Sequence, residues 1–385
     1  MIKKTKYYSW KLNNLADGCE QCIKGQKLVM FVTGICPRQC SYCPLSEHKK
    51  DHDVIFANER QLNDEDDIKA VLEEVRACKS EGAGFTGGDP LTRIDRTCNY
   101  IRLLKKNFGK RFHIHLYTSM ELLDEKNLSK LNDAGLDELR LHPELYNNKL
   151  WHKISLFYDT QKRKYDFRFG IEIPVLPDSY GLTKGVIDCF INWVDFINLN
   201  ELEISDAENF KLRNVKTRNR SYYGAKGSQE TALKLLKYID SKYPKSNVHF
   251  CTCKLKDKAQ LGNRLRTRAL NTKKIFDIVT DDGTVIRGAI YLKELSPGFG
   301  YRRKINEIIN TKEIFKKLEQ SKNIIIKKYS VPKRFIETDQ RKFRLITNIG
   351  IVEQLSKDLK SLGMIPAVVE QYPTWDQMEV DITFL

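Results

Sequence analysis

A regular alternation of strands and helices most limits the folds open to this chain. Short apolar segments rich in β-branched residues are followed by amphipathic segments of about ten to fifteen residues, roughly seven times before residue 252. Strands separated by helices of this length pair in parallel. The alternation therefore predicts an α/β fold with a parallel sheet, and we expect a partial, TIM-like (β/α) barrel.

The expected elements follow from hydrophobic periodicity and from turn residues. In such a barrel the active site lies at the carboxyl ends of the strands, so residues that follow each strand are the first candidates for function. The expected strands are 28–33, 82–86, 113–117, 138–141, 168–174, 195–204 and 247–251, and the expected helices are 64–79, 92–107, 124–134, 183–193 and 228–243.

Three cysteines follow the first expected strand, in the segment Cys36-Pro37-Arg38-Gln39-Cys40-Ser41-Tyr42-Cys43. Thiolates this close in sequence can bind three irons of a 4Fe-4S cluster. The fourth iron then either takes a distant ligand or stays open for a small molecule. A zinc site is the alternative, and it would need a fourth ligand such as His48 or His52.

A glycine-rich turn, Gly87-Gly88-Asp89, closes the second expected strand. Glycines allow a close backbone approach to a ligand and a positive φ, and a carboxylate suits an ammonium group. A plain βα turn would have the same composition. Its place in register behind the cysteine loop favours a ligand-binding function.

The cysteine loop, with its spacing and with Tyr42 before the last cysteine, resembles the cluster loop of the radical S-adenosylmethionine superfamily. In that family the three cysteines hold a 4Fe-4S cluster, and its open iron chelates the amino and carboxylate groups of S-adenosylmethionine. Gly87, Gly88 and Asp89 resemble the motif that holds the methionyl amino group, although Glu is more common than Asp there. The resemblance covers residues 1 to about 255, and it is strongest to an archaeal-type branch related to pyruvate formate-lyase activating enzymes.

The resemblance implies reductive cleavage of S-adenosylmethionine to a 5′-deoxyadenosyl radical, with electrons from an external donor such as ferredoxin or flavodoxin. It also implies ligand contacts at the ends of the later strands. Asn198 and Asn200 share one strand face while Glu201 points to the other, so we expect only one of these sets to face the ligand. The implied contacts are Tyr117, Thr118, Ser119, Glu172, Asn198 and Asn200.

A second set of thiols lies outside this loop, as Cys19 and Cys22 before the first strand and Cys251 and Cys253 after the last. Four sulfurs suit a second iron–sulfur cluster or a structural zinc. Because a six-residue strand spans roughly 20 Å, the segment with Cys19 must fold back along the barrel for the pairs to meet. Separate thiols or disulfides are the alternative. The other cysteines are expected to be small apolar fillers of helices: Cys78, Cys98 and Cys189.

The chain is strongly basic, with a formal charge of +16. This charge favours a polyanionic partner, and tRNA or another RNA is the predicted substrate; a lysine-rich solvated surface would give the same charge. A loop at 211–226 adds basic and aromatic residues that suit phosphates and bases: Arg213, Lys216, Arg218, Arg220, Tyr222 and Tyr223.

Two other functions stay open. One is modification of a protein or peptide, including glycyl radical activation. The other is a non-catalytic, zinc-binding RNA module. The sequence has no run of 18 apolar residues that would predict a membrane span, and residues 1–10 lack the apolar segment of a secretory signal. We therefore expect a cytoplasmic protein without membrane contact.

The pattern of predicted elements changes near residue 270. Asp281-Asp282-Gly283-Thr284 lies between two alternating apolar segments and predicts a hairpin. Strands 342–347, 365–370 and 378–384 with helix 351–362 then suggest a small α+β domain. The expected organisation is an approach segment at 1–27, a barrel at 28–255 and an accessory domain at 270–385.

Overall fold

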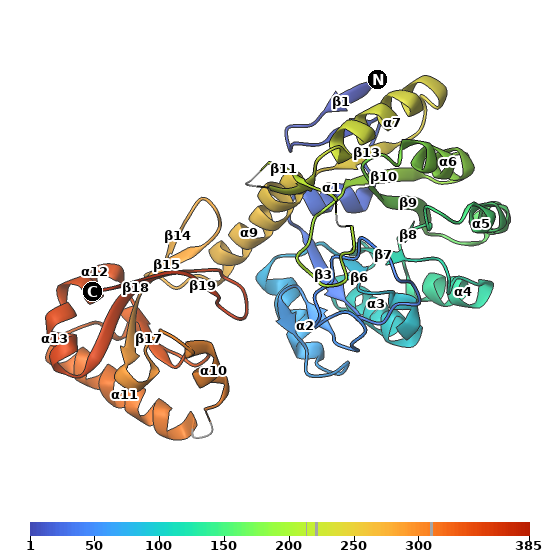
Figure 1. Ribbon diagram of the computed structural model, residues 1–385. Helices are drawn as coiled ribbons and strands as arrows, with labels where there is room; N and C mark the ends of the chain where they lie inside the picture. The colour runs from blue at the N-terminus through green and yellow to red at the C-terminus, as the bar shows by residue number, and fades with distance from the viewer. Residues whose placement is uncertain (213, 220–221, 309–310) are drawn as a thin grey trace. The chain divides into compact units, whose positions relative to one another are not determined.

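The computed structural model (Figure 1) describes residues 1–212, 214–219, 222–308 and 311–385. The chain forms two compact units, Met1–Arg264 and Leu265–Leu385. The boundary falls inside helix α9 (Gly262–Thr272). No helix in the described part of the chain is long and apolar enough to span a membrane.

The first unit contains one large, curved sheet whose central strands are parallel, as the alternation predicts. These strands are β3 (Lys27–Phe31), β6 (Gly82–Thr86), β7 (His113–Thr118), β8 (Glu138–Leu141), β9 (Arg168–Val175), β10 (Phe196–Glu201) and β13 (Val248–Cys251).

Short antiparallel strands extend both edges of the sheet: β1 (Ile2–Lys4) and β2 (Trp10–Leu12) beyond β13, and β4 (Phe56–Ala57) and β5 (Arg60–Gln61) beyond β3. Among the described residues, β1 and β5 end the strand order and do not pair with each other. The sheet is therefore a partial barrel.

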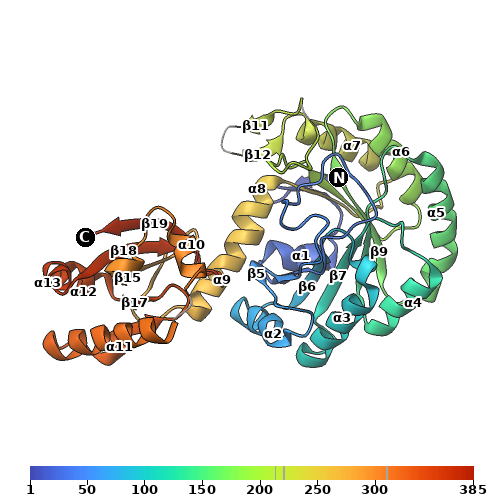
Figure 2. The ribbon, with the colours of Figure 1, turned by 60° about the horizontal axis from the view of Figure 1, so that its bottom comes forward.

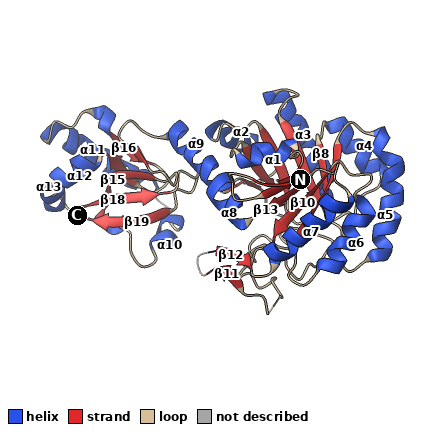
Figure 3. Cartoon of the chain, turned by 90° about the horizontal axis from the view of Figure 1, so that it is seen from above, coloured by secondary structure: helices blue, strands red, loops and turns tan. Residues whose placement is uncertain are grey.

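Helices cover the outer face of this sheet, as Figures 1 and 2 show. Each buries an apolar stripe against the strands; α3, for example, buries Tyr100, Ile101 and Leu104. A separate hairpin, β11 (Thr217–Asn219) with β12 (Tyr222–Ala225), lies off the main sheet (Figure 3). The outer helices are α2 (Ile68–Ala77), α3 (Ile94–Phe108), α4 (Glu125–Ala134), α5 (Asn148–Gln161), α6 (Tyr180–Phe190) and α7 (Ser228–Lys242).

Helix α1 (Asp17–Ile23) packs inside the curve of the sheet, against β6, β7 and the π-helical segment Lys256–Leu261. Figure 2 shows it on the opposite side of the strands from α2 and α3. The Gly18 amide donates to Glu138, the first residue of β8, at 3.0 Å. Residues 1–27 are therefore part of the barrel unit and not a separate approach segment, because β2 pairs with β13 and α1 closes the floor of the lumen.

The second unit is an antiparallel sheet with helices, which agrees with the expected α+β class. The strand order is β16–β17–β15–β18–β19, and β14 pairs with β15 as the predicted hairpin. The strands are β14 (Ile278–Val279), β15 (Val285–Leu292), β16 (Ile336–Asp339), β17 (Arg344–Thr347), β18 (Met364–Gln371) and β19 (Glu379–Phe384), and the helices are α10 (Tyr301–Asn306), α11 (Thr311–Lys328), α12 (Ile349–Gln354) and α13 (Ser356–Ser361).

Candidate active site

A cavity of about 390 Å³ lies at the carboxyl ends of the parallel strands. Its volume lies in the range of small-molecule and cofactor sites. The three cysteines of the loop after β3 line it, together with residues that follow β6, β7, β8, β9 and β10. The predicted residues among its described lining are Cys36, Cys40, Tyr42, Cys43, Gly87, Gly88, Tyr117, Thr118, Ser119, Glu172, Asn200 and Glu201.

Arg38 anchors the cysteine loop to the ends of two neighbouring strands. Its buried guanidinium donates to the backbone oxygens of Ser119 and His142, the second at 2.6 Å, and pairs with Glu121 at 2.7 Å. The Arg38 amide also lies 3.4 Å from the Cys36 sulfur. The loop is therefore held in place by long-range contacts and not by its own backbone alone.

The three sulfurs are not gathered as closely as a single zinc ion would require. Tetrahedral zinc with bonds of about 2.3 Å holds its sulfurs roughly 4 Å apart. Among the described residues, no set that includes two of these cysteines and a third ligand lies within 4.8 Å of one another. The alternative ligands also fail, because His48 and His52 are absent from the described lining and His52 Nδ1 donates to the Lys50 oxygen at 2.8 Å. The donor set fits a 4Fe-4S cubane, whose irons are spread over its corners.

Burial raises the pKa of the Cys36 thiol to about 11, and the hydrogen bond from the Arg38 amide opposes that shift. Burial also raises the pKa of Cys40, and here the Arg38 guanidinium is the main opposing influence. Because iron binds thiolates and not thiols, the Arg38 cation favours the metal-binding form of the loop.

The turn at Gly87 and Gly88 packs directly against the backbone of the cysteine loop. A Cβ at Gly88 would lie 2.6 Å from the Gly34 oxygen and would also overlap the Ile35 oxygen, and Gly87 has φ +152° with its α-carbon facing the Thr33 oxygen. The amides of Gly88 and Asp89 donate to Thr33 and Ile35 at 2.8 and 2.9 Å. The glycines therefore serve loop packing as well as lining the cavity.

Asp89 is fully buried and does not belong to the described cavity lining. Its Oδ1 accepts from the Leu91 amide at 2.9 Å, while Oδ2 accepts from Thr118 Oγ1 at 3.0 Å and from the Ser119 amide at 2.9 Å. Burial raises its pKa despite these donors. In this structure the carboxylate positions the end of β7, through Thr118 and Ser119, which line the cavity. A direct contact of Asp89 with a ligand ammonium stays a prediction.

Glu172 is one of the carboxylates that line the cavity. Oε1 accepts from Asn200 at 3.0 Å, and Oε2 accepts from Asn198 at 2.9 Å and from Arg140 at 2.8 Å. Burial would raise its pKa, but Arg140 and the two amides outweigh burial and lower it. The group is ionised at neutral pH, and these three donors leave one of its roughly four acceptor positions for a ligand.

Asn198 and Asn200 share one face of the sixth strand, as expected: both line a second, deeper cavity and both donate to Glu172, and Asn200 also lines the upper cavity. Glu201, expected to face away, also lines the upper cavity, because β10 ends at this residue and strand alternation stops there. The Glu201 carboxylate pairs with Arg218 at 3.0 Å and accepts from the Cys253 amide at 2.9 Å.

His142 is a lining residue that sequence reasoning missed. Its Nδ1 donates to the Glu172 backbone oxygen at 3.0 Å, so the neutral ring accepts from the Tyr42 hydroxyl at Nε2, 2.9 Å away. Burial, reinforced by the Arg38 cation, lowers its pKa to about 4. The ring therefore links the cysteine loop to β9; its only signal in the sequence is its position directly after the expected strand 138–141.

A second cavity of about 300 Å³ lies deeper in the lumen and shares residues such as Tyr117 and Glu172 with the first. Cys19, Cys22 and Cys251 line it, but Cys253 does not belong to its described lining. Three of the four expected sulfurs therefore line this cavity. The Cys253 sulfur instead lies 4.0 Å from the backbone oxygens of Glu201 and Leu202.

The other cysteines are also free thiols, with Cys78 and Cys98 buried and Cys189 half-buried.

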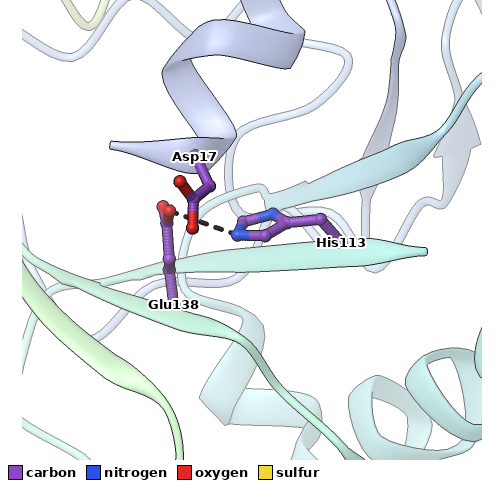
Figure 4. Close-up of side chains that lie close together, drawn as sticks. All are labelled: Asp17, His113 and Glu138. Atoms are coloured by element: carbon purple, nitrogen blue, oxygen red, sulfur yellow. Dashed lines mark ion pairs between the residues drawn. The ribbon is translucent and has the colours of Figure 1, made fainter. Parts of the chain in front are cut away.

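The floor of the barrel holds an ionic cluster in which Asp17, His113 and Glu138 lie close together (Figure 4). Glu138 pairs with Arg140 at 2.7 Å and accepts from His113 at 3.2 Å. His113 Nδ1 in turn accepts from Lys27 at 2.7 Å. Because cations already occupy this carboxylate and this ring, we interpret the cluster as structural and not as a metal site.

The basic loop at 211–226 is only partly described. Arg213 and Arg220, and the side chain of Tyr222, lie outside the described residues. Arg218 pairs with Glu201, and the Tyr223 hydroxyl donates to Asp257 at 2.7 Å. Arg218 and Tyr223 are thus engaged inside the barrel unit, whereas Lys216 is exposed.

Comparison with known proteins gives matches along both units. Residues 30–168 match the Radical SAM superfamily, and residues 283–385 match a domain of unknown function, DUF8061. A Methanocaldococcus jannaschii protein named "Putative glycyl-radical enzyme activating enzyme" is 35% identical over 383 residues, covering 98% of this chain and 94% of that protein.

Two further matches cover smaller shares of the chain. A biotin synthase of Thioalkalivibrio sulfidiphilus is 32% identical over 124 residues, or 31% of this chain and 34% of that enzyme. The crystal structure of Streptococcus suis SuiB bound to S-adenosylmethionine gives a TM-score of 0.40 at 14% identity, covering 59% of this chain and 47% of that one.

Proposed function

The chain belongs to the radical S-adenosylmethionine superfamily, and from that membership we propose that it is an activating enzyme that abstracts hydrogen from a protein or peptide substrate. The relationship that carries this proposal is the match to the Methanocaldococcus protein, because it runs through both units and not only through the barrel. The name of that relative is the reason to place a glycyl-radical enzyme first among protein substrates.

Superfamily membership implies a 4Fe-4S cluster and S-adenosylmethionine. Together, when bound, they supply a 5′-deoxyadenosyl radical after one-electron reduction. We propose that Cys36, Cys40 and Cys43 hold three irons of that cluster. An external donor such as ferredoxin or flavodoxin would provide the electron.

The residues around the cavity then divide the remaining tasks. Tyr42 and His142 brace the cysteine loop, and Asp89 holds Thr118 and Ser119 at the end of β7. Glu172 and Asn200 present an ionised acceptor and an amide to the ribose or amino group of S-adenosylmethionine. Each of these groups is fixed by neighbouring hydrogen bonds, so the site is organised before its ligands bind.

An RNA substrate, which the net charge of +16 first suggested, receives less support. The names of the two relatives reported above give no RNA function, and one cation of the basic loop, Arg218, is already paired with Glu201. The lysine-rich surface explains the charge without a polyanionic partner.

The test is an anaerobic assay of 5′-deoxyadenosine after reconstitution with iron, sulfide and S-adenosylmethionine. Flavodoxin supplies the electrons, and the added substrates are a recombinant glycyl-radical enzyme from the same genome or total tRNA. We expect the added glycyl-radical enzyme to stimulate cleavage of S-adenosylmethionine and to acquire a carbon radical visible by electron paramagnetic resonance. We expect a Gly→Ala variant of that enzyme to acquire no radical.

Two controls make the outcome clear. Cys40→Ala should abolish both 5′-deoxyadenosine and the radical, because it removes a ligand of the first cluster. Stimulation by tRNA that disappears as salt is raised, with no effect of any protein substrate, would replace the proposal by RNA modification.

A further inference from the structure

We infer that Cys19, Cys22 and Cys251 hold a second iron–sulfur cluster in the lumen of the barrel. The proposal goes beyond the proposed function and does not depend on it. The three thiols come from segments more than 200 residues apart in sequence, α1 and the end of β13, and they line one cavity of about 300 Å³. Cys19 and Cys251 are buried, and Cys22 is partly buried.

Cationic side chains accompany the thiols. Arg140 Nη2 lies 3.5 Å from the Cys19 sulfur, and Lys256 lines the same cavity as Cys251. Both cations also pair with carboxylates, Arg140 with Glu138 and Glu172 and Lys256 with Glu203, so they offset only part of the charge of the thiolates. Three thiolates add negative charge to any cluster that they hold, and buried charge is tolerated only where opposite charge or donors offset it. Asn198 and Gln260 provide such donors, to Cys19 at 3.2 Å and to Cys251 at 3.7 Å.

Lys27 is an independent reason to expect an anion here. It is buried and lines the cavity beside Cys22. Its described partners are neutral, namely His113 Nδ1 at 2.7 Å and the backbone oxygens of His113 and Ala83, and it forms no ion pair among the described residues. An unpaired buried ammonium is costly, and a metal-bound Cys22 thiolate would be its missing counter-ion.

His249 suits the fourth ligand position. It precedes Cys251 by two residues on β13, so both side chains point to the same face of the strand. Its Nε2 is tethered to Ser9 Oγ at 3.1 Å, whereas its buried Nδ1 has no hydrogen-bond partner among the described groups. A ring held through one nitrogen while the other stays open is the arrangement of metal-binding histidines, and histidine ligates iron in some clusters.

No set of three possible ligand atoms drawn from these cysteines and His249 lies within 4.8 Å of one another in the described structure, so these side chains are not gathered for one tetrahedral ion. The cavity of about 300 Å³ that they line has room for a larger group. Binding requires each thiol to lose its proton to solvent. The cluster would occupy the chamber that adjoins the first site, since both cavities share Tyr117 and Glu172.

The experiment removes the first site and asks whether iron remains. The full chain with Cys36, Cys40 and Cys43 all changed to Ser is reconstituted anaerobically, and iron, acid-labile sulfide and the electron paramagnetic resonance spectrum are measured. We expect about half of the wild-type iron and a reduced-cluster signal that S-adenosylmethionine does not alter, because His249 closes the fourth position.

Further changes assign that signal. In the same background, Cys19→Ser with Cys22→Ser and Cys251→Ser should abolish the remaining iron, and His249→Ala should shift the spectrum. Cys253→Ser is the matched control, because this buried thiol is two residues from Cys251 but outside the described cavity lining, and it should keep the iron.

A parallel series in the wild-type background covers the case in which the triple variant does not fold. There, loss of the three lumen thiols should lower iron and sulfide by about half, and Cys253→Ser should lower neither. Equal iron in the wild-type chain and the lumen variant, or stoichiometric zinc without sulfide, would overturn the inference. Neither readout requires turnover, so failure of the proposed function leaves it intact.

Discussion

Replacing Gly88 by Ala should displace the cysteine loop without touching any iron ligand. The added Cβ would lie 2.6 Å from the Gly34 oxygen and 2.7 Å from the Ile35 carbonyl carbon, whereas Cβ atoms in proteins essentially never approach other atoms closer than 3.0 Å. The two backbone segments must therefore separate by about 0.4 Å or more. Overpacking of this kind costs about 1–3 kcal/mol.

The displacement would act on the loop that carries the cluster. The Gly88 and Asp89 amides donate to Thr33 and Ile35, the residues that lead into Cys36. Stretching these bonds moves the start of the loop relative to Arg38. We expect lower iron and sulfide per chain after reconstitution, and weaker binding of S-adenosylmethionine by calorimetry.

Gly181→Ala is the matched control for this substitution. Gly181 lies in α6, and no atom lies within 4 Å of the position where its Cβ would be placed. Alanine in a helix is favoured over glycine by roughly 0.5–1 kcal/mol, so this variant should unfold at equal or higher urea concentration with normal iron content. If Gly88→Ala loads iron and binds S-adenosylmethionine as the wild type does, the packing argument is refuted.

Three further predictions test the site. Arg38→Met should lower the free energy of unfolding, measured by urea titration, by about 2–4 kcal/mol and should lower cluster content, because it leaves backbone acceptors and Glu121 without their donor. The control is Arg93→Met, which removes a half-exposed pair with Asp53 and should lower the free energy of unfolding by less than about 1 kcal/mol. His142 is buried and neutral, and its pKa is about 4, so the stability that it contributes is present above pH 6.5 and is lost as the pH falls towards 4. Between these two pH values the free energy of unfolding of His142→Asn should therefore fall by about 3 kcal/mol less than that of the wild type, as measured by urea unfolding at each pH. Cys40→Ala should abolish cleavage of S-adenosylmethionine, whereas Cys22→Ala should leave uncoupled cleavage partly intact; equal complete loss of 5′-deoxyadenosine in both would contradict separate functions for the two thiol sets.

Sequence reasoning succeeded where the relevant residues are close together along the chain. The alternation of strands and helices predicts β6 and β8 with their observed bounds, and the cysteine loop and the Gly87-Gly88 turn are contiguous motifs. The hairpin of β14 and β15 follows from a local turn signal. Such features depend on backbone propensity and on spacing, which a sequence displays directly.

It failed where long-range contacts decide the arrangement. Arg38 bonds to Ser119 and His142, residues 81 and 104 positions away, and nothing local marks those partners. Asp89 looks like a ligand-binding acid in a motif, yet its carboxylate caps the end of a neighbouring strand. Helices α5 and α11 were not predicted, although α11 is as amphipathic as helices that were.

The polarity of the lumen ties the fold to its proposed chemistry. A closed TIM barrel fills its interior with layers of bulky apolar side chains. Here the inward-facing groups of the middle strands include Arg140, Glu172, Asn198 and His249, which line cavities instead of filling them. Glu138 and Glu172 pair with Arg140 at 2.7 and 2.8 Å, and this pairing offsets part of the cost of burying the three charges.

A lumen of this kind has a consequence for where reactants can lie. Helix α1 closes the floor beneath β7 and β8, so reactants enter at the cavity at the carboxyl ends of the strands. This cavity lies beside the cysteine loop. A reactive species formed there would be surrounded by fixed dipoles and shielded from bulk solvent. Replacement of Arg140 by Met should therefore harm both the fold and this chemistry, because it leaves Glu138 and Glu172 buried without their cation. Neutralising these carboxylates by Glu138→Gln and Glu172→Gln should restore stability but not the stimulation of 5′-deoxyadenosine formation by substrate.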